Sequence, residues 1–150
     1  MELIDCKNLL QEERLRRIFA YSQYSPSDLE TEENKEQLAR RVAQLQADPD
    51  VFAYACLCSG EAAGVIVLQR APGFPDCYDM VGIAVQPAFR GHGMGAQLVE
   101  HAAVSLGAKE FRAETDDGAV GFYRCHGFDV TSLGEKYPGV IRYLCTLRLV

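Results

Sequence analysis

The chain has 150 residues, 48% hydrophobic and 24% charged, which is typical of one globular domain over residues 1–150 that is long enough to bury a core. Its net charge of −6 argues against a nucleic-acid partner, because surfaces that bind nucleic acids are strongly basic. No apolar run approaches the roughly 18–20 residues that span a bilayer, and the N-terminal segment does not resemble a signal peptide. We therefore expect a cytoplasmic protein without a membrane partner.

Cysteine spacing predicts free thiols rather than disulfides or a metal site. An exported chain would suit a disulfide framework, but no export signal is present. Zinc requires clustered Cys or His at ligand spacing, and only Cys56–Cys58 and Cys125–His126 come close to it. We expect buried thiols in a reducing compartment and no metal. The six cysteines are Cys6, Cys56, Cys58, Cys77, Cys125 and Cys145.

The N-terminal third predicts a short strand followed by two helices. Residues Glu2–Cys6 favour a strand, and the apolar spacing over about residues 8–24 favours a helix. The segment Ser27–Glu30 has the pattern of a capping box and predicts the start of a second helical region. That region has one apolar stripe and ends at Asp48–Asp50. The stripe consists of Leu38, Val42 and Leu45.

The periodicity then changes to that of strands. Segments Val51–Ser59 and Ala63–Arg70 predict a hairpin that turns at Ser59–Gly60. A loop over Ala71–Asp76 separates this hairpin from a third strand, Tyr78–Val85.

A helix that ends near Gly107 follows the third strand. Beyond it we expect a strand over Phe111–Glu114, a helix over Asp116–His126 with Gly127 as its C-terminal cap, and a final strand over Val140–Leu149. The element order is β-α-α-β-β-β-α-β-α-β-β. It predicts an α/β (α+β) fold with a mixed, mostly antiparallel sheet flanked by helices.

The segment Arg90-Gly-His-Gly-Met-Gly95 lies between a strand and a helix. Backbone N–H groups at a helix N-terminus bind phosphate or pyrophosphate, and glycines let the anion approach the backbone. The simpler alternative is a tight turn without a ligand. A dinucleotide fingerprint also fits loosely, but only 54 residues follow Ala96, too few for further βαβ units. A P-loop is excluded because the Lys-Ser/Thr pair is missing.

Two motifs resemble the GNAT superfamily of N-acetyltransferases. Segment Arg90–Gly95 fits its Arg/Gln-x-x-Gly-x-Gly/Ala signature, and Asp116–Phe128 resembles its second signature, Asn-x-x-Ala-x-x-x-Tyr-x-x-x-Gly-Phe, with Asp116 in place of the usual Asn. The motifs occur in the family order, and the resemblance extends from about Val51 to Phe128. It implies the GNAT-like sheet, with acetyl-CoA as co-substrate.

The resemblance also implies which residues bind the cofactor. Backbone groups of Ile83, Ala84 and Val85 are expected to pair with the pantetheine arm as another strand would. The pyrophosphate is expected on the loop and the first helical turn. Asp116 has two interpretations, as a cofactor contact or as a helix cap. The residues of the pyrophosphate loop are Arg90, Gly91, His92, Gly93, Met94, Gly95 and Ala96.

Two residues are candidates for proton transfer. Tyr123 matches the family tyrosine that protonates the CoA sulfur, although aromatic core packing also explains it. Asp79, eleven residues before Arg90, is the candidate base. On its strand it shares an otherwise apolar face, where desolvation would raise its pKa. The alternatives are an ordinary exposed Asp at a strand start, with Glu114 or a water chain as the base.

We therefore expect acetyl transfer to a primary amine of a small molecule or peptide by direct attack in a ternary complex. A non-catalytic module that senses CoA or binds a partner is the alternative. Transfer of a longer acyl group and homodimer formation stay open. An acidic segment in the second helical region favours either a cationic amine or a solvated helix face. Its carboxylates are Asp28, Glu30, Glu32, Glu33 and Glu36.

Overall fold

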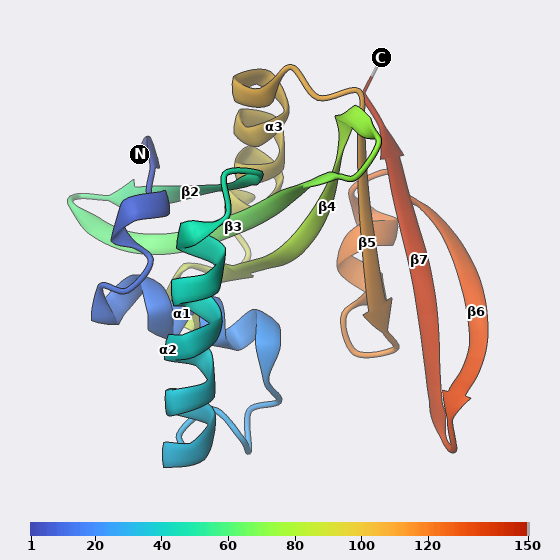
Figure 1. The fold of residues 1–150 in the computed structure, drawn as a ribbon, viewed down its shortest axis with the longest axis horizontal. Helices are drawn as coiled ribbons and strands as arrows, with labels where there is room; N and C mark the ends of the chain where they lie inside the picture. Colours follow the sequence, from blue (N-terminus) through green and yellow to red (C-terminus); the bar gives the residue numbers. More distant parts are fainter. Residues whose placement is uncertain (150) are drawn as a thin grey trace. The chain divides into compact units, whose positions relative to one another are not determined.

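The structure is a computed structural model that describes residues 1–149, and its elements follow the predicted order (Figure 1). Two short 3-10 turns, Lys7–Leu9 and Pro87–Phe89, add to this order. The helices are α1 (Glu13–Gln23), α2 (Glu32–Ala47), α3 (Met94–Leu106) and α4 (Val120–Cys125). The strands are β1 (Glu2–Asp5), β2 (Val51–Cys58), β3 (Glu61–Ala71), β4 (Phe74–Val85), β5 (Glu110–Asp116), β6 (Asp129–Tyr137) and β7 (Val140–Arg148).

The seven strands form one hydrogen-bonded sheet in the order β1-β2-β3-β4-β5-β7-β6. Its pairings are mostly antiparallel, and β4 and β5 pair in parallel. The chain forms two compact units, and β4 contributes to both. The first unit contains residues 1–69 and 81–102, and the second contains residues 70–80 and those from 103 onward.

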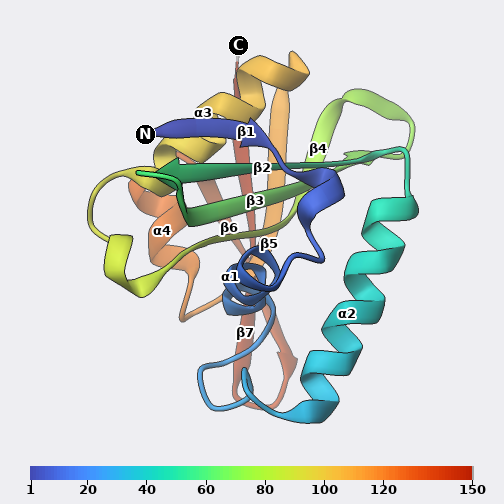
Figure 2. The ribbon, with the colours of Figure 1, turned by 90° about the vertical axis from the view of Figure 1, so that its left-hand side faces the viewer.

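In the first unit, helices cover both faces of the strands. Figure 2 shows α1 and α2 on one side of β1, β2 and β3, and α3 on the other. The predicted stripe of Leu38, Val42 and Leu45 is buried, as are Ile18 and Phe19 of α1. These apolar side chains and the β2–β3 hairpin form one core, which holds α1 and α2 against the sheet.

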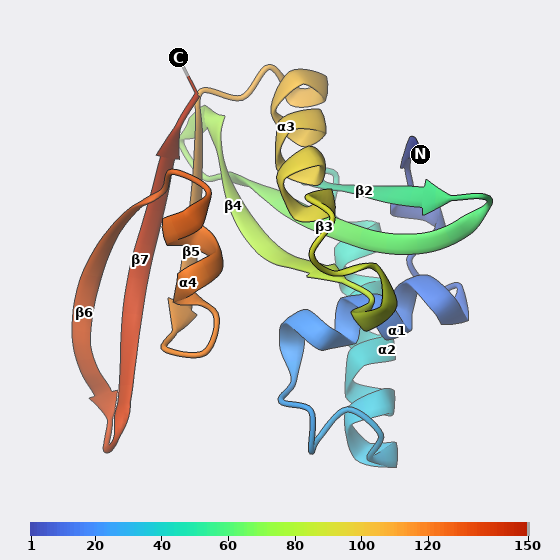
Figure 3. The same cartoon turned by 180° about the vertical axis from the view of Figure 1, so that it is seen from behind.

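The second unit is a small sheet with one short helix. Strand β7 pairs antiparallel with both β5 and β6, and the first half of β4 pairs in parallel with β5 (Figure 3). Helix α4 packs on β6 and β7. Phe111, Tyr123, Phe128 and Cys145 are buried here, so the second signature segment supplies much of this core.

Helix α1 begins later than the sequence predicted. Residues Lys7–Leu9 form a separate 3-10 turn, and Glu12 is the N-terminal cap. The Glu12 carboxylate accepts hydrogen bonds from the backbone N–H groups of Arg14 and Leu15 at 3.1 and 3.2 Å. This satisfies donors that lack a partner at a helix start, and it fixes the first residue at Glu13.

The predicted capping box at Ser27–Glu30 is wrong. Thr31 caps α2 instead, because its hydroxyl accepts a hydrogen bond from the Asn34 N–H at 3.3 Å. Asp28 belongs to the preceding turn, where its carboxylate accepts from the Ser25 hydroxyl at 2.8 Å. Several Ser, Thr and Asp side chains compete to cap this helix, and local sequence does not decide between them.

The β2–β3 hairpin is confirmed, with Ser59 and Gly60 at φ values of +50° and +80°. The loop predicted over Ala71–Asp76 is wrong in extent, since β3 continues to Ala71 and β4 begins at Phe74. The helix predicted from Asp116 is also shorter, because Asp116 ends β5 and α4 begins at Val120.

None of the helices described between residues 1 and 149 is long and apolar enough to cross a membrane. All six cysteines are free thiols. Cys6, Cys56 and Cys145 are buried as predicted, whereas Cys125 is exposed and the other two are half-buried.

Candidate functional site

The glycine-rich loop places backbone donors at the start of α3, within the first unit. Gly91 and Gly93 have φ values of +84° and +77°, which favour glycine over any other residue. A Cβ built on either of them meets no atom within 4 Å, so the backbone faces open space. Helix α3 has 13 residues, and its first turn holds no acidic side chain that would compete for an anion. The loop therefore has the geometry of an anion-binding helix start.

Arg90 fixes this loop against the end of β4. Its Nε donates a hydrogen bond to the Val85 carbonyl at 2.9 Å. Its guanidinium lies 5.4 Å from the centre of the Tyr21 ring on α1. His92 is exposed in the loop. The predicted residues 90–96 thus form one continuous segment of the first unit, in which Arg90 is anchored and Gly95 is buried.

The edge of β4 that faces away from β3 carries the backbone N–H and C=O groups of every second residue. The Gln86 N–H donates to the Ala63 carbonyl of β3 at 2.7 Å. Backbone groups alternate in an antiparallel pair, so Ala84 faces β3 while Ile83 and Val85 face the opposite edge. Of the three predicted pantetheine contacts, the structure brings Ile83 and Val85 to one edge and turns Ala84 away from it.

Side chains already occupy two carbonyls of this edge. Arg90 donates to Val85, and the Gln23 amide of α1 donates to the Val81 carbonyl at 3.1 Å. Judged over residues 1–149, the Ile83 carbonyl and the N–H groups of Ile83 and Val85 remain for an extended ligand. Nothing in the local sequence pattern predicts the contact of Gln23, because its partner lies 58 positions away along the chain.

Gly82 lets α1 approach this part of β4 closely. A Cβ at Gly82 would overlap the Ser22 Oγ and would lie 2.9 Å from both the Gln23 Nε2 and a ring carbon of Phe19. Phe19 is fully buried and fixed in the core, so the helix has little room to move. Position 82 therefore requires a glycine, because a larger side chain would overlap α1.

Gly82→Ala is expected to lower the free energy of unfolding by about 1–3 kcal/mol, because overpacking shifts α1 from β4. Gly121→Ala is the matched control, since its Cβ meets no atom within 4 Å and its helical position favours Ala by about 0.5–1 kcal/mol. Urea unfolding of both variants measures the difference. Equal stability of the two variants would contradict the close approach.

Tyr123 lies in the second unit, on α4. It is 7% exposed, and its ring makes edge-to-face contacts with Phe122 and Phe128 at centroid distances of 5.2 and 5.1 Å. Burial, with a smaller effect of Cys145, raises the pKa of Tyr123 to about 12. The side chain is therefore both a packing residue and a phenol that keeps its proton at neutral pH, which a general acid requires.

Asp79 has different surroundings from those expected. Its carboxylate is half-exposed and lies 3.5 Å from the Arg112 Nε on β5. The expected desolvation on an apolar face is wrong, because the Asp79 side chain is half-exposed and β5 brings a guanidinium beside it. Arg112 also lies 3.9 Å from Glu110, so two carboxylates share one cation.

Glu114, the alternative base, is held by two cations. Its Oε1 accepts from the Lys136 Nζ at 3.2 Å and from the Arg142 Nε at 3.4 Å. The hydrogen bond from Lys136, with a further one from Arg142, lowers the pKa of Glu114. A carboxylate with a lowered pKa is a weaker base, so this arrangement favours a structural role.

Asp116 closes the turn before α4. Its Oδ1 accepts hydrogen bonds from the Gly118 and Ala119 N–H groups at 3.0 and 3.3 Å. The N-terminal cap of α4 is Ala119, which makes no side-chain capping hydrogen bond, so Asp116 stabilises the preceding turn and does not cap the helix. Next to it, Asp117 accepts a 2.6 Å hydrogen bond from the Tyr143 hydroxyl of β7 and ties this turn to the sheet.

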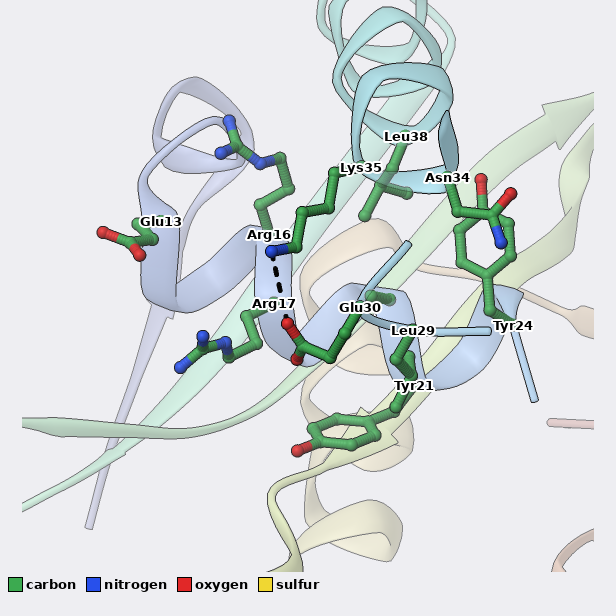
Figure 4. A pocket seen from close by; sticks show the side chains of 11 residues that line it. Glu13, Arg16, Arg17, Tyr21, Tyr24, Leu29, Glu30, Asn34, Lys35 and Leu38 are labelled. Carbon is green, nitrogen blue, oxygen red and sulfur yellow. Dashed lines mark ion pairs between the residues drawn. The ribbon is translucent and has the colours of Figure 1, made fainter. Parts of the chain in front are cut away.

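A cavity of about 120 Å³ lies between α1, α2 and the loop that joins them (Figure 4). Lys35 crosses it, and its Nζ lies 3.3 Å from Glu30 and 3.8 Å from Glu32. Arg16 and Arg17 line the same cavity. Lys35 therefore pairs with two carboxylates of the acidic segment, which weakens the expectation that this segment selects a cationic amine.

His101 and His126 are the two histidines outside the glycine-rich loop. His101 is half-buried, and its ring makes an edge-to-face contact with Tyr54 at 5.2 Å. His126 is also half-buried, and its Nδ1 lies 2.6 Å from the Phe122 carbonyl. Both histidines take part in packing.

Solved structures of other proteins share this fold. A GNAT-family protein from Desulfovibrio desulfuricans matches with a TM-score of 0.76 and 19% identity, over 99% of both chains. An aminoglycoside 6'-N-acetyltransferase complexed with coenzyme A matches with a TM-score of 0.73 and 15% identity, over 100% of this chain and 98% of that one. The ribosomal-protein-S18-alanine N-acetyltransferase from Escherichia coli matches with a TM-score of 0.72 and 17% identity, over 98% of this chain and 92% of that one. At these identities the likeness shows the fold.

The sequence itself identifies the family. No curated protein matches the chain. The sequence profile described as the acetyltransferase (GNAT) family matches residues 9–128, which include both signature segments. This match covers most of the chain and agrees with the seven-stranded sheet and the glycine-rich loop before α3. The chain therefore belongs to the acetyltransferase (GNAT) family.

Proposed function

We propose that this protein transfers the acetyl group of acetyl-CoA to a primary amine of a small molecule or peptide, by direct attack in a ternary complex. The observation that carries the proposal is the loop before α3, where Gly91 and Gly93 open the backbone toward space that a diphosphate would fill. A solved structure of the same fold contains coenzyme A, which supports this choice of ligand.

The residues present fit such a co-substrate. Amides from Gly91 to Ala96 would hold the pyrophosphate, and the free groups of Ile83 and Val85 would pair with the extended arm. Acetyl-CoA would supply the acetyl group as a thioester. Because the protein carries a net charge of −6, local amide geometry rather than overall attraction has to hold the anion.

Tyr123 is the proposed acid. The amine nitrogen bonds to the acetyl carbonyl carbon, the C–S bond breaks, and the amine loses one proton. Tyr123 donates its hydroxyl proton to the departing thiolate, and its raised pKa keeps that proton available at neutral pH.

A base is needed because a lysine-like amine, with a pKa of about 10.4, is neutral in only about one molecule in 2,500 at pH 7. Recovering that factor is worth up to roughly 4–5 kcal/mol. Asp79 is the proposed base, with Arg112 beside it. Glu114 is the less suitable carboxylate, since two cations already bind it.

Asp79→Asn is expected to lower kcat at pH 7 by at least about tenfold, because general bases contribute factors of this order or larger. The loss should shrink as the pH approaches the pKa of the amine, which then deprotonates without help. Glu114→Gln is the matched control and should stay within about twofold of the wild type. Steady-state rates measured from pH 6 to 10 test this assignment. A larger loss of kcat in Glu114→Gln than in Asp79→Asn would make Glu114 the base instead.

Two measurements test the proposed function. Calorimetry with acetyl-CoA should show micromolar binding, and absence of binding would contradict the first half of the proposal. Release of free thiol from acetyl-CoA should then be measured over a panel of small amines, amino acids, polyamines, aminoglycosides and peptides. Binding without thiol release on any amine would favour the non-catalytic module instead.

A further inference from the structure

The outward stripe of α2 and the end of α1 enclose a second cavity in the first unit. Its volume is about 470 Å³. Four of the five α2 residues that line it, all except Leu38, are spaced i, i+3, i+4 and i+7, so they share one helix face. No acidic side chain lines it. The lining residues are Gln23, Tyr24, Gln37, Leu38, Arg40, Arg41 and Gln44.

The charge of this cavity is uncompensated. Arg40 and Arg41 are exposed, and neither has an ion pair or a hydrogen bond from its side chain within residues 1–149. Lys35, on the same helix, differs because it pairs with Glu30 and Glu32. Two adjacent guanidinium groups without a carboxylate, on a protein of net charge −6, make a local site for an anion.

The hydrogen bonds among the residues that line this cavity leave the side-chain N–H groups of Gln37 available to a ligand. The Gln37 Oε1 accepts from the Tyr24 hydroxyl at 2.7 Å, so the amide nitrogen of Gln37 remains a donor. Together with the guanidinium groups of Arg40 and Arg41, it matches the acceptor oxygens of a carboxylate.

Gln23 connects this cavity to β4. Its Nε2 donates to the Val81 carbonyl at 3.1 Å and contacts the Ser22 hydroxyl at 3.0 Å. A carbonyl only accepts, so the nitrogen of Gln23 has to face Val81, and the Oε1 is left to accept an N–H from a ligand. Val81 lies on the strand whose next free groups, at Ile83, are those proposed for the co-substrate arm.

We propose that the acceptor is an amine that also carries a carboxylate. Arg40 and Arg41 bind the carboxylate, and the Gln23 Oε1 accepts a hydrogen bond from the amine or from a neighbouring amide N–H of the same molecule. The inference rests on the proposed function and names its substrate class. It favours an acceptor with a carboxylate over a purely cationic one, because Lys35 pairs with Glu30 and Glu32 of the acidic segment and no acidic side chain lines this cavity.

The test compares di-, tri- and tetraglycine with the same peptides as C-terminal amides, since each pair differs mainly in one negative charge. We expect kcat/KM for at least one free acid to exceed that of its amide by about tenfold. In the double variant Arg40→Gln, Arg41→Gln, the free acid and its amide should have nearly equal kcat/KM. The kcat/KM values for the amides and the affinity for acetyl-CoA should stay within about twofold of the wild-type values.

The matched control is Lys35→Gln, which removes one positive charge from the same helix outside this cavity. It should keep the preference for the free acid. Arg40→Glu should reverse the preference. Thermal unfolding of each variant separates a loss of fold from a loss of binding.

Binding is also measured without turnover, by calorimetry of each peptide pair in the presence of coenzyme A. Tighter binding of a free acid that is lost in the double Arg variant supports the inference, even where no amine is acetylated, and in that case the proposed function fails by itself. Equal binding or equal turnover of acids and amides, or a preference that the double variant retains, overturns the inference. Acetylation of the amides would then leave the proposed function standing.

Discussion

Gly93→Glu is expected to weaken acetyl-CoA binding at least a hundredfold. The wild-type backbone at this position has a φ of +77° and faces open space before α3. A glutamate would project into that space, where its carboxylate competes for the helix N-terminal amides and repels a diphosphate. Isothermal calorimetry measures the loss directly.

The control for Gly93→Glu is Gly139→Glu in the turn between β6 and β7. Gly139 has a φ of +79°, and a Cβ there also meets no atom within 4 Å, so backbone strain and added charge are matched. This control should bind acetyl-CoA as the wild type does. If both variants bind equally, the loop does not hold the diphosphate.

Tyr123→Phe is expected to lower kcat by about 10²–10³, because a general acid contributes factors of about 10²–10⁴. The affinity for acetyl-CoA should change less than twofold, since the ring and its contacts with Phe122 and Phe128 remain. Tyr78→Phe is the matched control, as Tyr78 is a buried phenol that makes an edge-to-face contact with Phe111. Unchanged turnover in Tyr123→Phe would remove the acid role.

The pH dependence gives a second test of the acid role. An acid acts only while protonated, and burial raises the pKa of Tyr123 to about 12 from an ordinary value of 10. The rate should therefore show no decline from this group until the pH rises toward 12. A basic limb of kcat near pH 10 that disappears in Tyr123→Phe would contradict the raised pKa.

Much of the fold follows from short-range patterns in the sequence. The stripe of α2, the turn at Ser59–Gly60 and the glycine loop before α3 depend on residues within a few positions of one another. Helix starts were harder to predict. Glu12 and Thr31 cap α1 and α2, whereas the local pattern favoured an earlier start for α1 and Ser27–Glu30 for α2.

The candidate site divides in the same way. Within residues 90–96, Gly91 and Gly93 adopt positive φ values that glycine tolerates better than other residues, so the local sequence was enough to predict this open loop before α3. The environments of Asp79 and Glu114 depend on cations from other strands, Arg112 in one case and Lys136 and Arg142 in the other. A sequence does not contain the distances that set an electrostatic interaction.

The sequence by itself determined the order of elements, the family and the glycine-rich loop before α3, since each depends on local spacing and backbone preference. The tertiary structure decided which groups on β4 are free, which carboxylates are paired and where two arginines lack a counter-charge. Gln23 shows the reason most clearly, because only folding brings its amide to a carbonyl 58 residues away.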